Sequence, residues 1–357
     1  MINETGQNTQ GVSKELVKNI NAQLQEAKTL SNEATAKWES YKQEKSVESQ
    51  EETTDNQSNV REFIFLAIAL SALSFSAIFT RLSQDYISVN ATVLNRFIFS
   101  ALALFLWHAI AQSRRSSEEV KPSNEENQLR DFLLLISLGI TAVLCTALWG
   151  WSLNQTSVAN SNLLHNATPL FTVLGAWLFL KERFSRQYLI GLAIAIGGTL
   201  LIGLQDFNVS LNSLIGDLAA LLSAAFYAGQ YLLMEQLGKK FNTPTILLAL
   251  TGTGAILLLP IVLIAGEDIF PSSLMGWVWV ACLVLISELL GQGLLAQSLK
   301  SFSSTFIAIV MLLEPFFTAI FAYFIFSEQL SLINWIGFFL VLAGIYVVKF
   351  ADRTAKV

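Results

Sequence analysis

Charged residues are scarce in most of this chain, and their scarcity excludes a soluble globular protein. The 357-residue sequence contains 14% charged residues, against roughly 25% in an ordinary globular domain. The shortage is uneven. Residues 1–60 hold 6 Lys/Arg and 10 Asp/Glu, so residues 61–357 keep only 16 basic and 17 acidic groups. A segment this apolar has too few polar groups to cover the surface of a globule in water.

Other absences exclude further classes of protein. Two cysteines and two histidines form neither a metal-ligand spacing nor a disulfide framework. No Walker A, Rossmann or H-E-x-x-H pattern is present, which argues against nucleotide-driven pumping and metalloprotease chemistry, and we predict no cofactor. A net charge of −5 without a basic patch argues against nucleic-acid binding. No secretory signal precedes the first apolar run near residue 63, so that run must act as its own insertion signal.

What the chain has in abundance is long apolar runs. Each run approaches the roughly 20 residues that a membrane-spanning helix needs, and the loops between them are short except at 112–130. We therefore predict an all-α polytopic membrane protein with an N-terminal extension over 1–60. The ten predicted spans are 62–80, 91–111, 131–152, 158–180, 186–204, 213–236, 244–265, 274–297, 303–326 and 331–350.

The distribution of Lys and Arg among the loops predicts the orientation. Cytoplasmic loops carry an excess of Lys and Arg. If the N-terminus is cytoplasmic, almost all Lys and Arg residues of the loops lie on the cytoplasmic side. The opposite loops have Arg81 as their one basic residue, together with Asp206, Glu267 and Asp268. We therefore predict that both termini are cytoplasmic, most simply at a plasma (inner) membrane. The inside residues are Arg114, Arg115, Lys121, Arg130, Lys181, Arg183, Arg186, Lys239, Lys240, Lys300, Lys349, Arg353 and Lys356.

The chain also contains an internal repeat. An offset of 146 aligns Pro169 with Pro315, Glu182 with Glu328, Gly191 with Gly337 and Gly198 with Gly344, and an offset of 152 aligns the segments upstream. The repeats are 61–204 and 213–350, followed by a short tail over 351–357. Each holds five spans, an odd number, so the second copy would enter the membrane from the opposite side. Such inverted repeats are typical of secondary transporters.

These residues resemble a known family. Arg96-Phe97, Pro169 with Glu182 and Gly191, and Glu314-Pro315 with Glu328 and Gly337 resemble signatures of the EamA branch of the drug/metabolite transporter (DMT) superfamily. The resemblance covers about 61–350. It implies a ten-helix exporter or exchanger of small metabolites with a central cavity. Asn162, His165 and Asn166 stand where the family usually has aliphatic or small residues, so the resemblance does not extend to the substrate class.

Ionisable residues inside the spans are the first candidates for function, because each costs about 2.5–3.5 kcal/mol at the bilayer centre. Arg96 either reaches the outer headgroups or faces the interior, toward an anionic group or a carboxylate. Glu314 lies at mid-span beside Pro315, which removes one backbone hydrogen bond, so a cation or proton site and a packing carboxylic acid both stay open. Glu288 with Gln292 one turn later presents the same two alternatives.

The fourth span adds a polar stripe. Asn162, His165 and Asn166 recur at helical spacing before Pro169, and we expect them to line a cavity. Gln230 and Gln297 are candidates to extend it. Pro169 and Pro315 are predicted helix breaks, and hence hinges, at matching depth.

The extension has its own pattern. Apolar positions over 13–42 keep a 3-4-3-4 spacing, which fits a short coiled coil or a surface-lying amphipathic helix. The polar segment 43–60 has the composition of a linker.

The features together predict a secondary transporter that exports or exchanges a small molecule by alternating access. An intramembrane enzyme, with His165 and Ser161 drawn as a dyad, and a membrane scaffold or receptor using the N-terminal helix are the alternatives. The expected partners are the solute, coupled or not to a proton or cation, and the lipid bilayer. Homo-oligomerisation stays open.

Overall fold

The protein is described from a computed structural model. It describes residues 60–114 except 77, then 125–152, 155–156, 158–203, 214–326 and 332–354, and isolated positions at 25, 37–39, 41–43 and 45. The chain divides into two compact units, Met1–Arg61 and Glu62–Val357. The second unit contains all the apolar runs.

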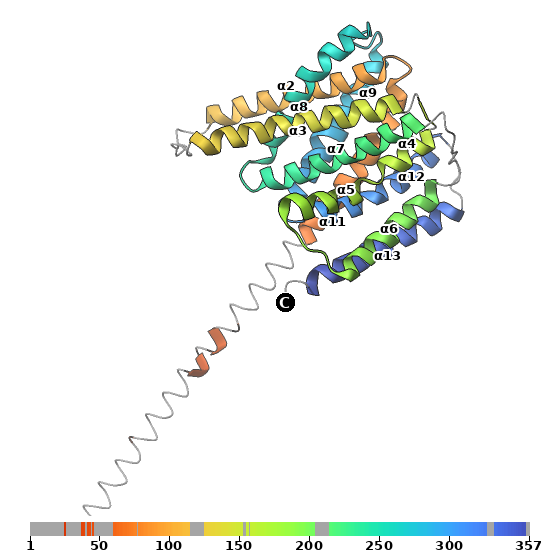
Figure 1. The fold of residues 1–357 in the computed structure, drawn as a ribbon. Coiled ribbons are helices and arrows are strands. Elements are labelled where there is room, and N and C mark those ends of the chain that lie inside the picture. Colours follow the sequence, from red (N-terminus) through yellow and green to blue (C-terminus); the bar gives the residue numbers. More distant parts are fainter. Residues whose placement is uncertain are drawn as a thin grey trace, which may run out of the picture. The chain divides into compact units, whose positions relative to one another are not determined.

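The described part of the second unit is built from helices, with no strand among them (Figure 1). The first helix covers Val60–Ser83. The others are α2 (Val89–Arg114), α3 (Glu125–Ser152), α4 (Val158–His165), α5 (Thr168–Gly175), η1 (Ala176–Leu180), α6 (Arg186–Gly203), α7 (Leu214–Gly238), α8 (Thr243–Ile264), α9 (Leu274–Cys282), η4 (Leu283–Gln292), α10 (Gly293–Ser298), α11 (Ser304–Val310), η5 (Met311–Leu313), α12 (Glu314–Phe326) and α13 (Leu332–Thr354).

Eight helical stretches of the described residues are long and apolar enough to cross a membrane. They lie at eight of the ten predicted spans. The remaining two predictions, the fifth and the tenth span, fall on the shorter apolar helices Arg186–Leu201 and Trp335–Ala351. The all-helical membrane character is thus confirmed, while the count of ten spans stays a prediction.

Three of the spans are not regular α-helices. The fourth span consists of α4, α5 and the π-helix η1, and a turn at Asn166–Ala167 separates its first two segments. The ninth consists of α11, the 3₁₀ turn η5 and α12. In both cases the irregular turn directly precedes a proline-containing first turn of helix, at Pro169 and Pro315, since proline lacks the N–H that would continue the ladder. The eighth span changes from α9 to the π-helix η4 and then to α10 with no proline inside it.

Short polar residues begin several of these helices. Asn242 accepts a hydrogen bond from the Thr245 amide at the start of α8, and Pro244 occupies the first turn. Ser273 and Ser303 cap α9 and α11 in the same way. These caps satisfy backbone donors that the helix itself leaves open. At the end of η1, Lys181 adopts a left-handed conformation (φ 58°) and stops the fourth span.

The helices pack in a consistent order. α2 lies along α8, and α3 lies between α7 and α8, as Figure 1 shows. α4 and α5 cover another side of α7, and α6 pairs with α13. The eighth span packs on the first, where Gly291 lies against Ala72 and Leu73.

Glycines set the spacing of α6 and α13. A Cβ atom added to Gly198 would lie 2.6 Å from the Gly337 carbonyl oxygen, and one added to Gly191 would lie 2.9 Å from that of Gly344. Adding one to Gly344 would bring it 2.6 Å from the Gly191 carbonyl oxygen. These contacts include backbone atoms of the facing helix, so a flexible side chain cannot simply move aside to make room for a Cβ atom. The two helices therefore approach as closely as small residues permit in a membrane.

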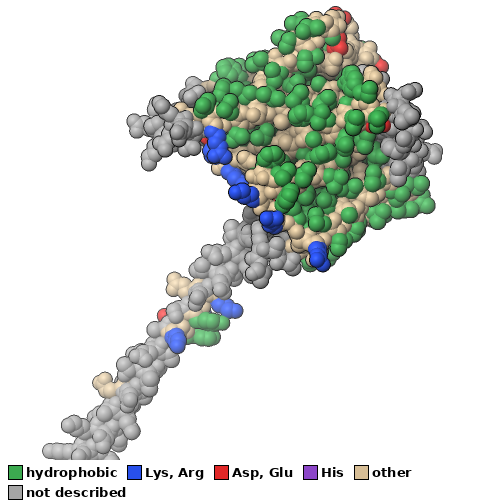
Figure 2. Space-filling model, viewed as in Figure 1, with side chains coloured by type: hydrophobic (Ala, Val, Ile, Leu, Met, Phe, Trp, Pro, Cys, Tyr) green, Lys and Arg blue, Asp and Glu red, His purple; other side chains and the backbone are tan. Residues whose placement is uncertain are grey.

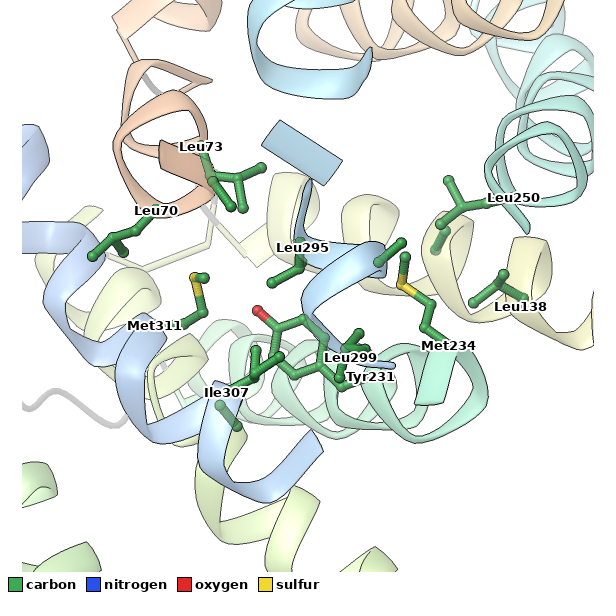
Figure 3. Packing of buried hydrophobic residues seen from close by; sticks show 14 of the residues in the cluster. Leu70, Leu73, Leu138, Tyr231, Met234, Leu250, Leu295, Leu299, Ile307 and Met311 are labelled. Atoms are coloured by element: carbon green, nitrogen blue, oxygen red, sulfur yellow. The ribbon is translucent and has the colours of Figure 1, made fainter. Parts of the chain in front are cut away.

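A buried apolar cluster lies between α7, α10 and α11. Tyr231 is fully buried there, and Leu295, Leu299, Ile307 and Met311 lie around its ring (Figure 3). Met234, Leu138 and Leu250 continue the cluster toward α3 and α8. The residues around the Tyr231 ring thus all come from the 213–350 half, and Leu138 on α3 joins the first half to the cluster.

The two ends of the helical bundle differ in charge. The Lys240 ammonium lies 2.7 Å from an Asp131 carboxylate oxygen, and Lys300 contacts the Gly238 position, so three connections meet at one end. Figure 2 shows Lys and Arg side chains along one edge of the surface and hydrophobic side chains over the face beside it. At the other end, Glu267 accepts hydrogen bonds from Ser88 and Asn90.

The prediction of a coiled coil or surface helix over 13–42 falls mostly outside the described residues. The described positions at 25, 37–39, 41–43 and 45 are helical. Trp38 and Tyr41, both on the predicted seam, stack with ring centroids 5.9 Å apart.

Adjacent glycines in α6 provide a test of the α6–α13 contact. Gly198→Ala places a methyl group against the backbone of α13, so we expect the thermal unfolding temperature in detergent to fall by several degrees, in line with about 1–3 kcal/mol for overpacking. Gly197→Ala is the matched control, because no atom lies within 4 Å of a Cβ built there. It should leave the unfolding temperature unchanged or raise it. Equal effects of the two substitutions would contradict the packing.

Candidate functional site

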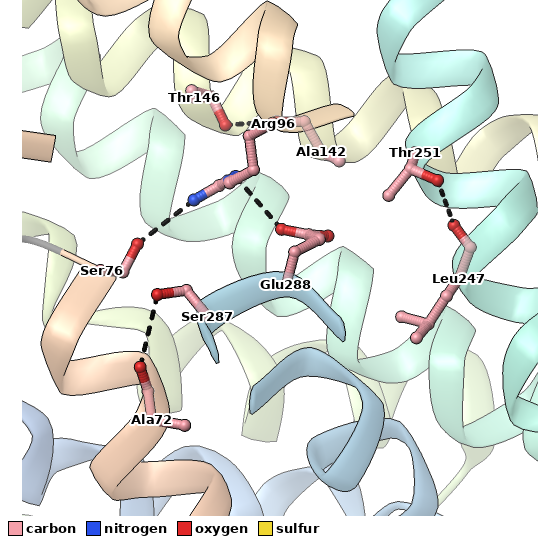
Figure 4. Close-up of polar contacts among 9 residues, drawn as sticks. All are labelled: Ala72, Ser76, Arg96, Ala142, Thr146, Leu247, Thr251, Ser287 and Glu288. Carbon is pink, nitrogen blue, oxygen red and sulfur yellow. Dashed lines mark hydrogen bonds and ion pairs between the residues drawn. The ribbon is translucent and has the colours of Figure 1, made fainter. Parts of the chain in front are cut away.

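An ion pair between the second and the eighth span forms the centre of the candidate site. Arg96 Nε on α2 lies 3.1 Å from Glu288 Oε2 on η4, and the Arg96 side chain is 18% exposed. An Arg96 Nη atom donates to Ser76 Oγ in the first span at 3.2 Å. Figure 4 shows the guanidinium between these two partners. Of the two alternatives for Arg96, the structure has the one facing the interior and a carboxylate.

Glu288 and Gln292 share the π-helical segment η4. Glu288 is 1% exposed and Gln292 9% exposed, so both are buried. The neighbouring Ser287 donates to the Ala72 carbonyl oxygen at 3.4 Å, which fastens η4 to the first span. π-Helical turns inside α-helices frequently occur at functional sites. Here the wider turn carries the only acidic residue of the eighth span.

Glu314 lies beside the break in the ninth span, and its side chain is half-buried. Ser74 Oγ of the first span lies 3.3 Å from the Glu314 backbone carbonyl oxygen, and Thr318 Oγ1 donates to the Ser74 carbonyl oxygen at 3.1 Å. The Ser74 hydroxyl also donates to the Leu70 carbonyl oxygen of its own helix at 2.8 Å, so the Thr318–Ser74 hydrogen bond is the firmer connection between the two spans at the break. The carboxylate that pairs with Arg96 is that of Glu288 on η4.

The polar stripe of the fourth span faces α3 and α7. Asn162 Oδ1 accepts from Trp149 Nε1 at 3.2 Å, and His165 Nδ1 lies 2.8 Å from Ser223 Oγ. Asn166, half-buried, belongs to the turn before Pro169. The structure thus brings the stripe into contact with neighbouring spans. The His165 carbonyl oxygen, four residues before Pro169, accepts from Thr168 Oγ1 at 2.7 Å.

The hydrogen bonds of Ser223 fix the tautomer of His165. Ser223 Oγ donates its one proton to the Ala220 carbonyl oxygen at 2.6 Å. A hydroxyl has a single O–H, so His165 Nδ1 must be the donor in the contact with Ser223, and in the neutral ring Nε2 is then an acceptor. The ring stacks on Tyr227 with centroids 5.3 Å apart, and Trp149 lies 6.3 Å away.

This arrangement does not fit a catalytic dyad. Ser161, the partner drawn for His165 from the sequence, hydrogen-bonds to Ser152 instead. The Ser223 hydroxyl, which does contact His165, donates its proton to the Ala220 carbonyl oxygen. Among the described residues no acidic side chain is hydrogen-bonded to His165, and no group of three His, Cys, Asp or Glu could hold a metal ion.

The two candidate glutamines lie nearer the basic end. Gln230 is buried on α7, with its Nε2 4.0 Å from the Met234 sulfur, and Gln297 accepts from Thr243 Oγ1 at 3.1 Å. Among the described residues, neither glutamine is hydrogen-bonded to Arg96 or Glu288. Of the acids that close the fourth and ninth spans, Glu182 is half-buried, and Glu328 lies outside the described residues.

Sequence reasoning missed a stripe on α7. Ser223, Tyr227 and Tyr231 recur every four residues, so they share one face of the helix. Tyr227 stacks on His165 and Tyr231, and it lies within electrostatic range of Glu314, Arg96 and Cys145. The four-residue spacing of hydroxyl side chains in an otherwise apolar run is the signal that could have revealed it.

Comparison with known proteins gives a concordant picture. The model of the EamA-like transporter family matches residues 61–204 and again 214–350. A transporter without an assigned substrate from Archaeoglobus fulgidus is 24% identical over 297 residues, which cover 81% of this chain and 97% of that protein. The pseudopaline exporter CntI of Pseudomonas aeruginosa is 26% identical over 55% of this chain and 67% of its own length.

Two further similarities extend the comparison. Solute carrier family 35 member F6 of Mus musculus is 28% identical over 40% of each chain. One solved crystal structure superposes with a TM-score of 0.67 at 16% identity, covering 82% of this chain and 99% of that one. At this identity the superposition shows a shared fold.

The His165–Ser223 contact can be tested with two serine variants. Ser223→Ala leaves the half-buried His165 ring without the acceptor of its Nδ1–H, so we expect a loss of about 1–3 kcal/mol in stability, measured by thermal unfolding in detergent. Ser71→Ala is the matched control, because the Ser71 hydroxyl bonds only to Ala67 in its own helix. A Ser223→Ala protein as stable as Ser71→Ala would contradict the assigned contact.

Proposed function

Because this chain belongs to the EamA-like transporter family, in the DMT superfamily, we propose that it exports a small metabolite by alternating access. The transporter uses two inverted five-helix repeats, 61–204 and 213–350, and the solute binds near the bilayer midplane between them. Export is supported by the similarity to a named exporter.

The observation that carries the proposal is the buried ion pair between the two matched regions. Arg96 belongs to the first region and Glu288 to the second. Intramembrane charges are costly and mark solute or ion pathways, and a buried ion pair is weak evidence for stability alone. A charge pair between the two halves is well placed to respond when they move relative to each other.

The contacts of α6 and α13 support the inverted repeat. At the offset of 146, Gly191 corresponds to Gly337 and Gly198 to Gly344. In the structure Gly191 meets Gly344 and Gly198 meets Gly337, so each glycine touches the counterpart of the other. That exchange is what a two-fold relation between the repeats requires. The irregular turns before Pro169 and Pro315 are likewise related by the offset, and they are the proposed hinges.

The charge difference between the two ends of the bundle supports an orientation with both termini in the cytoplasm. Lys240 and Lys300 lie at the basic end, where the positive-inside rule places the cytoplasm. Glu267 lies at the opposite end. We place the protein in the plasma (inner) membrane.

Single cysteines test this orientation. In a background lacking Cys145 and Cys282, a cysteine at Asn208 should react with an impermeant thiol reagent added to intact cells, because the loop lies outside. A cysteine at Lys240 should react only after the cells are opened, and one at Lys300 should behave like Lys240. Labelling of the 240 position from outside in intact cells would contradict the topology.

Glu314 provides the test of transport. Purified protein is reconstituted in liposomes loaded with a metabolite extract of the host cell, and the solutes that leave are identified by mass spectrometry. Wild type should release one solute or a small group of solutes faster than empty liposomes. Glu314→Gln should slow that release at least tenfold, because the charge beside the helix break biases the two conformations.

The control for this experiment is Asp131→Asn, which breaks an ion pair with the partly exposed Lys240. It should leave the release rate within twofold of wild type, since surface ion pairs contribute little. Unchanged release by Glu314→Gln, at equal protein in the liposomes, would reduce Glu314 to a packing residue. No solute released by wild type would contradict the proposed function itself.

A further inference from the structure

Two oxygen atoms of η4 are buried without a hydrogen-bond partner. Glu288 Oε2 faces Arg96, but Glu288 Oε1 has no partner among the described residues, and neither does Gln292 Oε1. Both side chains are at least nine-tenths buried. Figure 4 shows the second carboxylate oxygen of Glu288 turned away from Arg96. Leaving such acceptors unpaired costs the full desolvation penalty, which is larger for a charged group.

The chemistry of these atoms defines what would satisfy them. A carboxylate oxygen and an amide oxygen are both acceptors, and Glu288 and Gln292 lie four residues apart on one side of the helix. Hydrogen-bond donors or a small cation would pair with them, whereas an anion would be repelled. Glu288 carries a single negative charge, which Arg96 already balances from the other side, so a bound cation can carry only one positive charge and must compete with Arg96 for the carboxylate.

We propose that Glu288 Oε1 and Gln292 Oε1 form a binding site for a monovalent cationic group, and that this group competes with Arg96 for the Glu288 carboxylate. The group is the ammonium of a solute or a free alkali cation, which share the same chemistry at this site. Binding weakens the Arg96–Glu288 ion pair and with it the link between α2 and η4.

This inference deepens the proposed function, on which its role in transport rests, but its test needs no transport. Because Arg96 and the cationic group share one carboxylate, removing Arg96 has two opposite effects. The protein loses stability, since Glu288 is left as an unpaired buried charge. At the same time the site gains affinity for an added cation. A purely structural role of the ion pair would produce the first effect without the second.

The experiment is thermal unfolding of the full-length protein in uncharged detergent at fixed pH. Ammonium, methylammonium and sodium chloride are titrated, with choline chloride keeping the ionic strength constant, because the quaternary ammonium of choline has no N–H donor and is much larger than the three test cations. We expect at least one of the three cations to raise the unfolding temperature of wild type by about 2 °C or more. Arg96→Gln should reach half of its effect at a concentration at least fivefold lower.

The matched variants are chosen to separate the site from general salt effects. Glu288→Gln and Gln292→Leu should abolish the specific shift, and Gln292→Leu keeps both charges of the ion pair. Lys240→Gln breaks the 2.7 Å ion pair with Asp131 at the surface and should respond to the cations as wild type does. If Arg96→Gln does not fold, the comparison of wild type with Gln292→Leu decides.

The pattern of cations identifies the source of the charge. A shift with sodium assigns the site to a free cation, and a shift with ammonium or methylammonium but not sodium assigns it to the ammonium group of a solute. The proposal is overturned if none of the three cations stabilises wild type beyond choline, or if the shift persists in both Glu288→Gln and Gln292→Leu. Either result would leave the outcome of the liposome experiment untouched.

Discussion

The placement of one cation–carboxylate pair in an apolar interior is the constraint around which this structure is organised. Arg96 and Glu288 come from spans almost 200 positions apart in the chain, and neither could remain inside a membrane alone without a large free-energy cost. Their pairing requires α2 and η4 to be neighbours. That in turn places the first span beside η4, where Ser76 and Ala72 make their contacts.

The remaining polar groups of the interior follow a similar logic. His165 has Ser223 as its partner, and beside Glu314 the Ser74 carbonyl oxygen has Thr318. Each partner lies on a different span from the group it satisfies. In lipid, apolar surface alone does little to select which helices pair, so these contacts help to decide which spans are neighbours. The interior is therefore held by specific polar pairs in addition to close packing.

Close packing and irregular geometry are divided among different spans. α6 and α13 meet through glycines with backbone against backbone, which leaves little room for relative movement. The fourth, eighth and ninth spans contain π-helical or 3₁₀ turns, and the polar groups discussed above lie on or beside them. Under the alternating access proposed above, the irregular turns would be the segments that adjust, and the α6–α13 glycine contact the one that stays fixed.

The sequence by itself determined the helical membrane character, the family and the residue types that matter. The length of an apolar run follows from the thickness of a bilayer, and a proline inside a run removes one backbone hydrogen bond of the helix, although Pro260 lies inside the continuous helix α8. These properties depend on local composition, so Pro169 and Pro315 could be assigned as breaks and Arg96, Glu288 and Glu314 as candidates. The coiled-coil prediction lies mostly outside the described residues and remains a prediction.

Only the tertiary structure decided which of these groups meet. From the sequence, Arg96 could reach the outer headgroups or face an unnamed anionic group or carboxylate of the interior, because the sequence offers no measure of the distance between spans; its partner is Glu288. The partner of His165 was drawn as Ser161, four residues away on its own helix, and is Ser223 on α7. The π-helical segment η4 contains no proline, so no residue of the kind that marks the other two breaks predicts it. A contact between distant spans depends on how the helices are rotated and packed, and that is a property of the assembled bundle rather than of any single segment.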